Sequence, residues 1–283
     1  MYKEYIQNSY LRKCAMMTNL VRGKSMRASE VIMIGILAAL YAVVGRLTDL
    51  GMVAPVVGVV AFWPAAVIPA IFAVLYEPWT AGLGAGIGIF IRDMMFHGNA
   101  LLSLTVGVPA NFFSFFIIGY LAKRELDWRK ITLGWVMGVV ILGLGVGAST
   151  LLLPSQSSAF TGLSTLDSLI LFFGVSAGSF IVILAVAHFW PEWKNYGVAS
   201  VIGLGVGSII IGVFLWVYSQ FLPLPGGFQY LPTYFILLYI VWTFTTEIPF
   251  IMMMGPPVLK VCFKAFPNLV PKGMRRLTSG EKG

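Results

Sequence analysis

The chain has 283 residues, of which 58% are hydrophobic and only 11% charged, and its mean hydropathy is +0.88. Soluble domains carry about 25% charged residues, so the composition excludes an ordinary soluble protein and indicates a polytopic membrane protein. We interpret the net charge of +8 as membrane topology plus attraction to anionic lipid head groups, and not as nucleic-acid binding.

Eight apolar segments, each bounded by charged or turn-forming residues, are long enough to cross a bilayer core of about 30 Å. We therefore predict an all-α membrane protein with about eight transmembrane helices, packed through small residues. The segments lie at residues 31–50, 57–76, 80–96, 101–122, 131–153, 168–189, 198–220 and 233–254. Pro64 and Pro69 interrupt the second segment, and the third is short and rich in glycine, so this pair is expected to be broken or tilted.

The distribution of Lys and Arg divides the chain into three parts and orients it. Residues 1–29 form a basic tail without an apolar core of the signal-peptide type, 30–255 the transmembrane domain, and 256–283 an amphipathic helix with a basic tail. Loops near 97–100, 154–167 and 221–232 contain no Lys or Arg, whereas 123–130 and both tails are basic. Because basic residues resist translocation, we predict a multi-pass cell-membrane protein with both termini in the cytoplasm.

The pentapeptide Gly-Leu-Gly-x-Gly occurs three times inside apolar segments, beginning at Gly82, Gly143 and Gly203. A nucleotide-phosphate loop is not indicated, because no copy completes the GxGxxG pattern or follows a strand. The near-equal spacing is weak evidence of internal repetition. Glycines four apart share one helix face and allow a neighbouring membrane helix to approach closely. We expect such packing at Gly82/Gly86, Gly84/Gly88, Gly134/Gly138, Gly143/Gly147, Gly174/Gly178 and Gly203/Gly207.

Ionisable residues near the outer ends of two segments are the first candidates for function, because charges at membrane depth cost several kcal/mol unless paired or hydrated. One pair ends the first segment and another ends the third, and the predicted topology brings both to the same outer depth. If the two helices are neighbours, one polar patch forms from Arg46, Asp49, Arg92, Asp93, His97 and Asn99. The alternative is that these are ordinary interfacial charges whose long side chains reach water.

Three further side chains are candidates because prolines accompany them. Asn111 follows Pro109, and Glu247 precedes Pro249. A proline frees a backbone carbonyl, so a polar side chain beside it can line a cavity. Glu247 has no basic residue near it in sequence, and we expect it to be protonated or hydrogen-bonded to another helix. Trp63 offers a ring for stacking on a planar solute, although a position at the membrane interface explains it equally.

Catalytic signatures are missing from the sequence. It contains no HExxH, P-loop or Cys/His cluster, and His97 and His188 fall toward opposite faces of the membrane. Its one GxSxG match, Gly174 to Gly178, lies inside an apolar segment and lacks the preceding strand of a nucleophile elbow. Cys14 and Cys262 both fall on the reducing side. We therefore expect no enzymatic activity, disulfide, metal site or bound cofactor.

Several motifs resemble the membrane-embedded substrate-binding (S) components of energy-coupling factor (ECF) transporters. The likeness covers about residues 30–125, with a weaker match at the end of the last segment. The resemblance is seen in five segments: the small-residue run 36–45, the proline-containing run 62–71, residues 82–93, Val108-Pro-Ala-Asn-Phe-Phe113, and the stretch 247–260.

The resemblance implies a specific function. S components bind a vitamin or related micronutrient from outside, in a pocket at the outer helix ends, and work with a transmembrane scaffold subunit and two cytoplasmic ATPases. An Ala-x-x-x-Ala pattern on the first helix typically docks the scaffold, and Ala38 with Ala42 matches it, although internal packing explains the pair equally. Typical S components have six spanning segments, so the eight predicted here depart from that pattern. The alternative function is a stand-alone, proton-coupled secondary transporter of a small organic solute.

Overall fold

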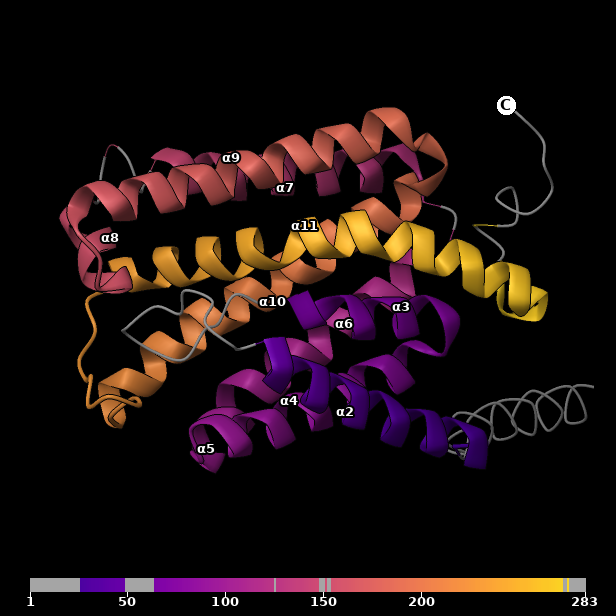
Figure 1. Cartoon of the computed structure of the whole chain (residues 1–283), viewed down its shortest axis with the longest axis horizontal. Coiled ribbons are helices and arrows are strands. Elements are labelled where there is room, and N and C mark those ends of the chain that lie inside the picture. The colour runs from indigo at the N-terminus through magenta and orange to yellow at the C-terminus, as the bar shows by residue number, and fades with distance from the viewer. Residues whose placement is uncertain are drawn as a thin grey trace, which may run out of the picture.

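The computed structural model describes residues 26–48, 64–124, 126–147, 151, 154–271 and 274, and within these ranges it contains helices and turns but no strand (Figure 1). The elements in chain order are α2 (Ala28–Thr48), η1 (Pro64–Ala66), α3 (Val67–Leu75), α4 (Pro78–Phe96), α5 (Ala100–Leu102), η2 (Ser103–Gly107), α6 (Val108–Ala122), α7 (Trp128–Gly147), α8 (Pro154–Thr161), α9 (Thr165–Phe189), η4 (Pro191–Trp193), α10 (Lys194–Phe221), α11 (Tyr234–Ala265) and η5 (Pro267–Leu269). The predicted all-α fold is therefore confirmed.

Six helices in the described residues are long and apolar enough to cross a membrane. They are Ala28–Thr48, Ala100–Ala122, Arg129–Gly147, Thr165–Phe189, Pro191–Phe221 and Tyr234–Ala265. The described parts of the other two predicted segments are also helical but do not meet the same criteria. Pro64–Leu75 is short, and Arg92 and Asp93 lower the hydropathy of α4. The structure thus confirms a multi-pass helical protein and leaves the count of eight unconfirmed.

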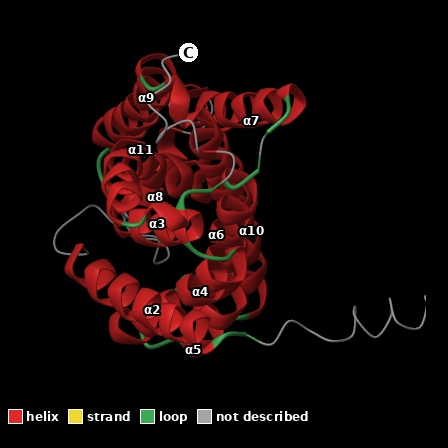
Figure 2. Cartoon of the chain, turned by 90° about the vertical axis from the view of Figure 1, so that its right-hand side faces the viewer, coloured by secondary structure: helices red, strands yellow, loops and turns green. Residues whose placement is uncertain are grey.

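The helices pack as two groups with α10 and α11 between them. Figures 1 and 2 place α2, α4 and α5 on one side of the molecule and α7 and α9 on the opposite side. Successive contacts lead from α2 to α4, α6, α10 and α11, while α7 and α9 contact each other and α11. Helix α3 packs against α4, α6 and α11. α11 therefore borders both groups of helices.

The glycines of α4 allow it to pack closely against two helices at once. A Cβ at Gly84 would come within 2.6 Å of the Leu37 side chain on α2, whereas one at Gly82 would lie 3.0 Å from atoms of Phe112 on α6. Residues two apart project to nearly opposite sides of a helix. The alternating glycines of the pentapeptide therefore clear both faces of α4, as the small-residue packing prediction requires.

The second and third copies of the pentapeptide differ in what they contact. On α10, a Cβ at Gly203 would lie 2.6 Å from the Ser114 carbonyl oxygen of α6, and Gly205 faces Met137 of α7. On α7, only the middle glycine is enclosed, since a Cβ at Gly145 would lie 2.7 Å from Ser176 Oγ. Open space surrounds Gly143/Gly147 and also Gly174/Gly178, so the prediction of close packing is wrong for these two pairs in the described structure.

Helix α11 continues without a break from Tyr234 to Ala265 and contains three prolines. Pro249 has no N–H to donate to the carbonyl of Thr245, four residues earlier. Ser179 Oγ on α9 donates to that carbonyl at 2.7 Å instead. The stretch from residue 256 to 265, predicted as a separate amphipathic helix, is the last part of α11.

Candidate functional site

A buried ion pair lies in the last turns of α4. Arg92 Nη1 donates to Asp93 Oδ1 at 3.1 Å, and the two residues are only 2% and 6% exposed. The guanidinium carbon of Arg92 also lies 4.4 Å from the centroid of the Phe96 ring, at a cation–π distance. Charged residues this well buried are uncommon and need partners, so the pair marks the first place to look for function.

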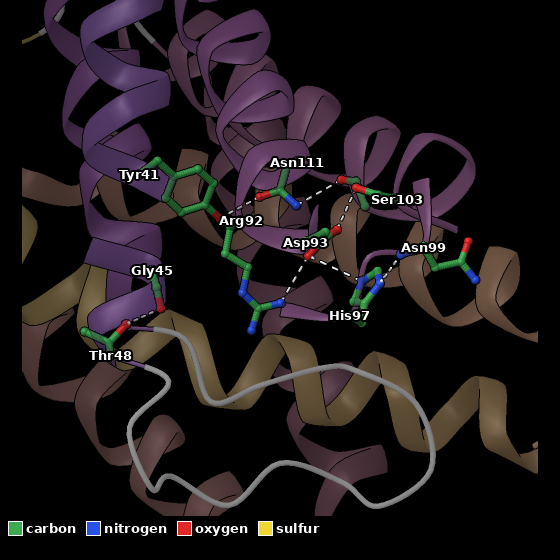
Figure 3. Close-up of polar contacts among 10 residues, drawn as sticks. Tyr41, Gly45, Thr48, Arg92, Asp93, His97, Asn99, Ser103 and Asn111 are labelled. Carbon is green, nitrogen blue, oxygen red and sulfur yellow. Dashed lines mark hydrogen bonds and ion pairs between the residues drawn. The ribbon is translucent and has the colours of Figure 1, made fainter. Parts of the chain in front are cut away.

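Asp93 joins α4 to the following helix. Its Oδ2 accepts a hydrogen bond from Ser103 Oγ at 2.7 Å, and its Oδ1 lies 3.7 Å from His97 Nε2, one turn later on α4 (Figure 3). A Cβ at Gly107 would lie 2.9 Å from Oδ2, closer than real Cβ contacts allow. The carboxylate therefore occupies a fitted position between α4 and η2.

The turn that approaches Asp93 is π-helical, and Pro109 explains its location. Within η2, the N–H of Val108 bonds to the carbonyl of Ser103, five residues earlier. Pro109 cannot donate to a carbonyl of this turn, and its ring disfavours the α-helical path before it. Single π-helical turns inside α-helices are frequent at functional sites. Here the turn presents Ser103 and the glycine at 107 to Asp93.

The turn after α4 fixes the tautomer of His97. The backbone N–H of Asn99 donates to His97 Nδ1 at 3.0 Å. Nδ1 is therefore the acceptor, and the ring proton lies on Nε2, which faces Asp93. Burial lowers the pKa of His97, the carboxylate of Asp93 raises it, and the charge of Arg92 lowers it further. With burial the largest effect, the neutral ring is favoured.

Asn99 connects this turn to α10. Its Oδ1 accepts the N–H of Leu102 at 3.0 Å and so caps α5. Its Nδ2 donates to the hydroxyl of Tyr218 on α10 at 3.1 Å. The polar contacts thus extend from α4 through the turn to a helix that lies more than 100 residues later in the chain.

A second chain of hydrogen bonds joins α2 to α6. The hydroxyl of Tyr41 donates to Asn111 Oδ1 at 2.6 Å, and Asn111 Nδ2 donates to the carbonyl of Gly107 at 3.0 Å. Figure 3 shows this chain beside the Asp93 contacts, with η2 common to both. We call the combined set the Asp93 cluster; its members are Tyr41, Arg92, Asp93, His97, Asn99, Ser103, Asn111 and Tyr218.

No protein-family model matches this sequence, and neither a curated protein nor a solved structure is significantly similar to it.

The structure brings together five of the side chains proposed from the sequence, namely Arg92, Asp93, His97, Asn99 and Asn111. Arg46 lies half-buried near the end of α2 and makes no hydrogen bond or ion pair with another described residue. Asp49 and Trp63 lie outside the described residues. Glu247 lies apart from these contacts, on α11.

Ala38 and Ala42 occupy an internal contact. They are 3% and 2% exposed, and a Cβ at Gly88 on α4 would lie 3.0 Å from the Ala38 carbonyl oxygen. Their burial favours internal packing, the alternative left open by the sequence, and docking of a scaffold subunit stays a prediction.

Three members of the Asp93 cluster were not predicted from the sequence: Tyr41, Ser103 and Tyr218. Each looks like an ordinary residue of an apolar helix, and only their tertiary contacts distinguish them. The proline after η2 was the available signal for Ser103, because a proline inside a helix disturbs the turn before it. Nothing comparable marks Tyr41 or Tyr218.

The cluster is suited to hydrogen bonding of a polar solute. It combines a charge-balanced Arg92–Asp93 pair, a neutral imidazole, a phenol from each of two helices and two amides. These groups come from α2, α4, the α5–α6 helix and α10, so a change at the cluster affects how four helices are held together. In the described residues, no group of three or more metal-ligating side chains occurs.

Proposed function

We propose that this chain is the membrane-embedded, substrate-binding subunit of an uptake system for a vitamin or similar micronutrient, of the S-component type. It would lie in the cell membrane with both termini in the cytoplasm, and α3 and α4 would complete eight membrane-embedded helical segments. A scaffold subunit and two cytoplasmic ATPases would supply the energy for release of the solute inside.

The observation that carries this proposal is the burial of the Asp93 cluster where four helices meet. Arg92 and Asp93 lie at the end of α4 that the basic-residue distribution assigns to the outside. Buried polar groups at membrane depth are costly, and they persist mainly where they bind or conduct something. A cluster of donors and acceptors at this end of α4 supports capture of a polar solute.

Reconstitution of the purified chain alone tests this proposal. Liquid chromatography with mass spectrometry of an extract from the purified protein should identify a bound small molecule. The same compound, radiolabelled, should bind to proteoliposomes containing the chain and should not accumulate inside them. Absence of any bound or binding solute would contradict the proposal.

Accumulation by the chain alone, driven by a proton gradient, would instead select the stand-alone carrier. One observation favours that second candidate: Glu247 lies within a membrane-spanning helix, and no described group donates a hydrogen bond to it. Asp93 already accepts from Arg92 and Ser103, so Glu247 is the better candidate for a coupling proton. Glu247→Gln should then abolish gradient-driven uptake.

A further inference from the structure

Glu247 is an acidic residue near the middle of α11, a 32-residue helix that is long and apolar enough to span the membrane. An ionised carboxylate at this depth requires a proton, a cation or strong donors to offset its desolvation. Its surroundings therefore indicate what the site is built to hold.

Two sides of α11 near Glu247 are occupied by packing contacts. On one, the backbone carbonyl of Thr245 accepts a hydrogen bond from the Ser179 hydroxyl of α9. On another, the hydroxyl of Tyr196 on α10 donates to the Ile251 carbonyl at 3.0 Å. Glu247 shares one helix face with Thr243 and Ile251, which lie four residues before and after it, and Thr245 points to another side. α11 also contacts η1 and α3.

Thr243, one turn before Glu247, carries a second polar group without a partner. The residue is 1% exposed, and its hydroxyl forms no hydrogen bond in the described structure. The neighbouring Thr245 and Thr246 behave differently, since each hydroxyl donates to the carbonyl four residues earlier, at 2.7 and 2.8 Å. Residues four apart lie on one helix face, so the unused hydroxyl and the carboxyl are neighbours.

No basic side chain in the described residues pairs with Glu247. Arg92, the basic residue buried among the helices, is paired with Asp93. The sequence between residues 49 and 63 contains no Lys or Arg that could serve instead. The charges of the Asp93 cluster thus balance each other, and the carboxyl of Glu247 is left without a compensating charge from the described chain.

We propose that Glu247 and Thr243 bind the positively charged group of the solute, an organic cation such as a protonated amine or a quaternary ammonium. The carboxylate supplies the counter-charge, and the Thr243 hydroxyl accepts from or packs against the cationic group. This inference rests on the proposed function, because it names the class of solute that the subunit captures. It also gives the buried hydroxyl a partner, as buried polar groups normally have.

The test measures binding to the full-length protein in lipid nanodiscs. The probes are the small-molecule extract of the native cells, analysed by mass spectrometry, and a charge-matched pair, choline and its neutral isostere 3,3-dimethyl-1-butanol. Glu247→Gln keeps the shape of the side chain and removes its charge. Thr243→Val keeps the shape of the threonine side chain and removes its hydroxyl. Glu192→Gln, in the exposed turn η4, is the matched control, and thermal melting verifies that each variant is folded.

We expect the retained compound to be a cation whose affinity falls about 100-fold in Glu247→Gln and about 10-fold in Thr243→Val, with no change in Glu192→Gln. Choline should bind more tightly than its isostere only when Glu247 is present. Retention of a neutral or anionic compound, or equal binding by wild type and Glu247→Gln, would overturn this inference and leave the proposed function standing. If the wild-type protein retains nothing from the extract, both fail.

Discussion

The Ser103 hydroxyl donates to Oδ2 of Asp93 at 2.7 Å, and this bond connects the π-helical turn η2 to the end of α4. The same carboxylate accepts from Arg92 through its other oxygen. Asp93 is therefore a junction between two helices as well as the counter-ion of a buried guanidinium. Loss of the carboxylate should affect both the fold and the site.

Replacing Asp93 tests how much this junction contributes to stability. Asp93→Ala removes the acceptor of Arg92 and Ser103 together, and breaking a buried ion pair typically costs about 3–5 kcal/mol. We expect that loss in the free energy of unfolding, measured by denaturant titration in detergent. Asp167→Ala is the control, because Asp167 accepts from Ser164 at the exposed start of α9 and should cost under about 1 kcal/mol. Equal losses for the two variants would contradict the assignment.

The link between α2 and α6 should respond to removal of a single oxygen. Tyr41→Phe keeps the buried ring and deletes the hydroxyl that donates to Asn111. A typical hydrogen bond contributes about 0.5–1.5 kcal/mol, and we expect a destabilisation in that range together with weaker solute binding. Tyr120→Phe, at an exposed ring, should change neither quantity. A Tyr41→Phe protein with unchanged melting temperature and affinity would show that the bond is incidental.

The glycine pentapeptides should differ in their tolerance of a methyl group. Gly203→Ala places a Cβ 2.6 Å from the backbone oxygen of Ser114, and overpacking of this kind costs about 1–3 kcal/mol. Gly178→Ala meets open space on α9 and should be neutral or stabilising by up to about 1 kcal/mol, since alanine favours the helix. Thermal melting of the two variants in one detergent distinguishes them. Similar melting temperatures would contradict close packing of α10 on α6.

Stability should fall on acidification because of His97. Burial keeps its folded-state pKa below the ordinary value of 6.5, so the unfolded chain binds a proton more readily. The stabilisation is complete above about pH 6.5 and is lost as the pH falls from there through the folded-state pKa. His97→Gln should flatten the dependence of melting temperature on pH below about 6.5. The exposed His188→Gln should retain the wild-type slope, and a wild-type slope in His97→Gln would contradict this account.

Much of the fold could be predicted because hydrophobic length alone specifies membrane helices. The spans of α2 and α9 match segments recognised from their apolar runs. The region from Pro64 to Phe96 was less predictable, since prolines and the Arg92–Asp93 pair weaken the pattern that identifies a span. Glycine spacing indicated which helix faces lack side chains. It did not indicate which of these faces packs against another helix.

Five of the eight members of the Asp93 cluster were predicted from the sequence. Charged residues in an apolar chain attract attention by themselves, which is why Arg92, Asp93 and His97 were recognised. Tyr41 and Tyr218 became members only through contacts across 70 and 119 positions of the chain, and no local pattern encodes those. Ala38 illustrates the converse, because a small-residue motif predicts close packing without specifying whether the partner helix lies inside or outside the chain.

The most direct test of the central claim is affinity purification of the tagged chain from its native membranes in mild detergent. Mass spectrometry should quantify the co-purifying proteins and small molecules, with Asp93→Asn as the comparison for solute retention. The account predicts a transmembrane scaffold subunit and two ATPases in fixed proportion to the chain, together with a small organic solute that the variant loses. Recovery of the chain alone, without solute, under conditions that hold a known multi-subunit transporter together would contradict it.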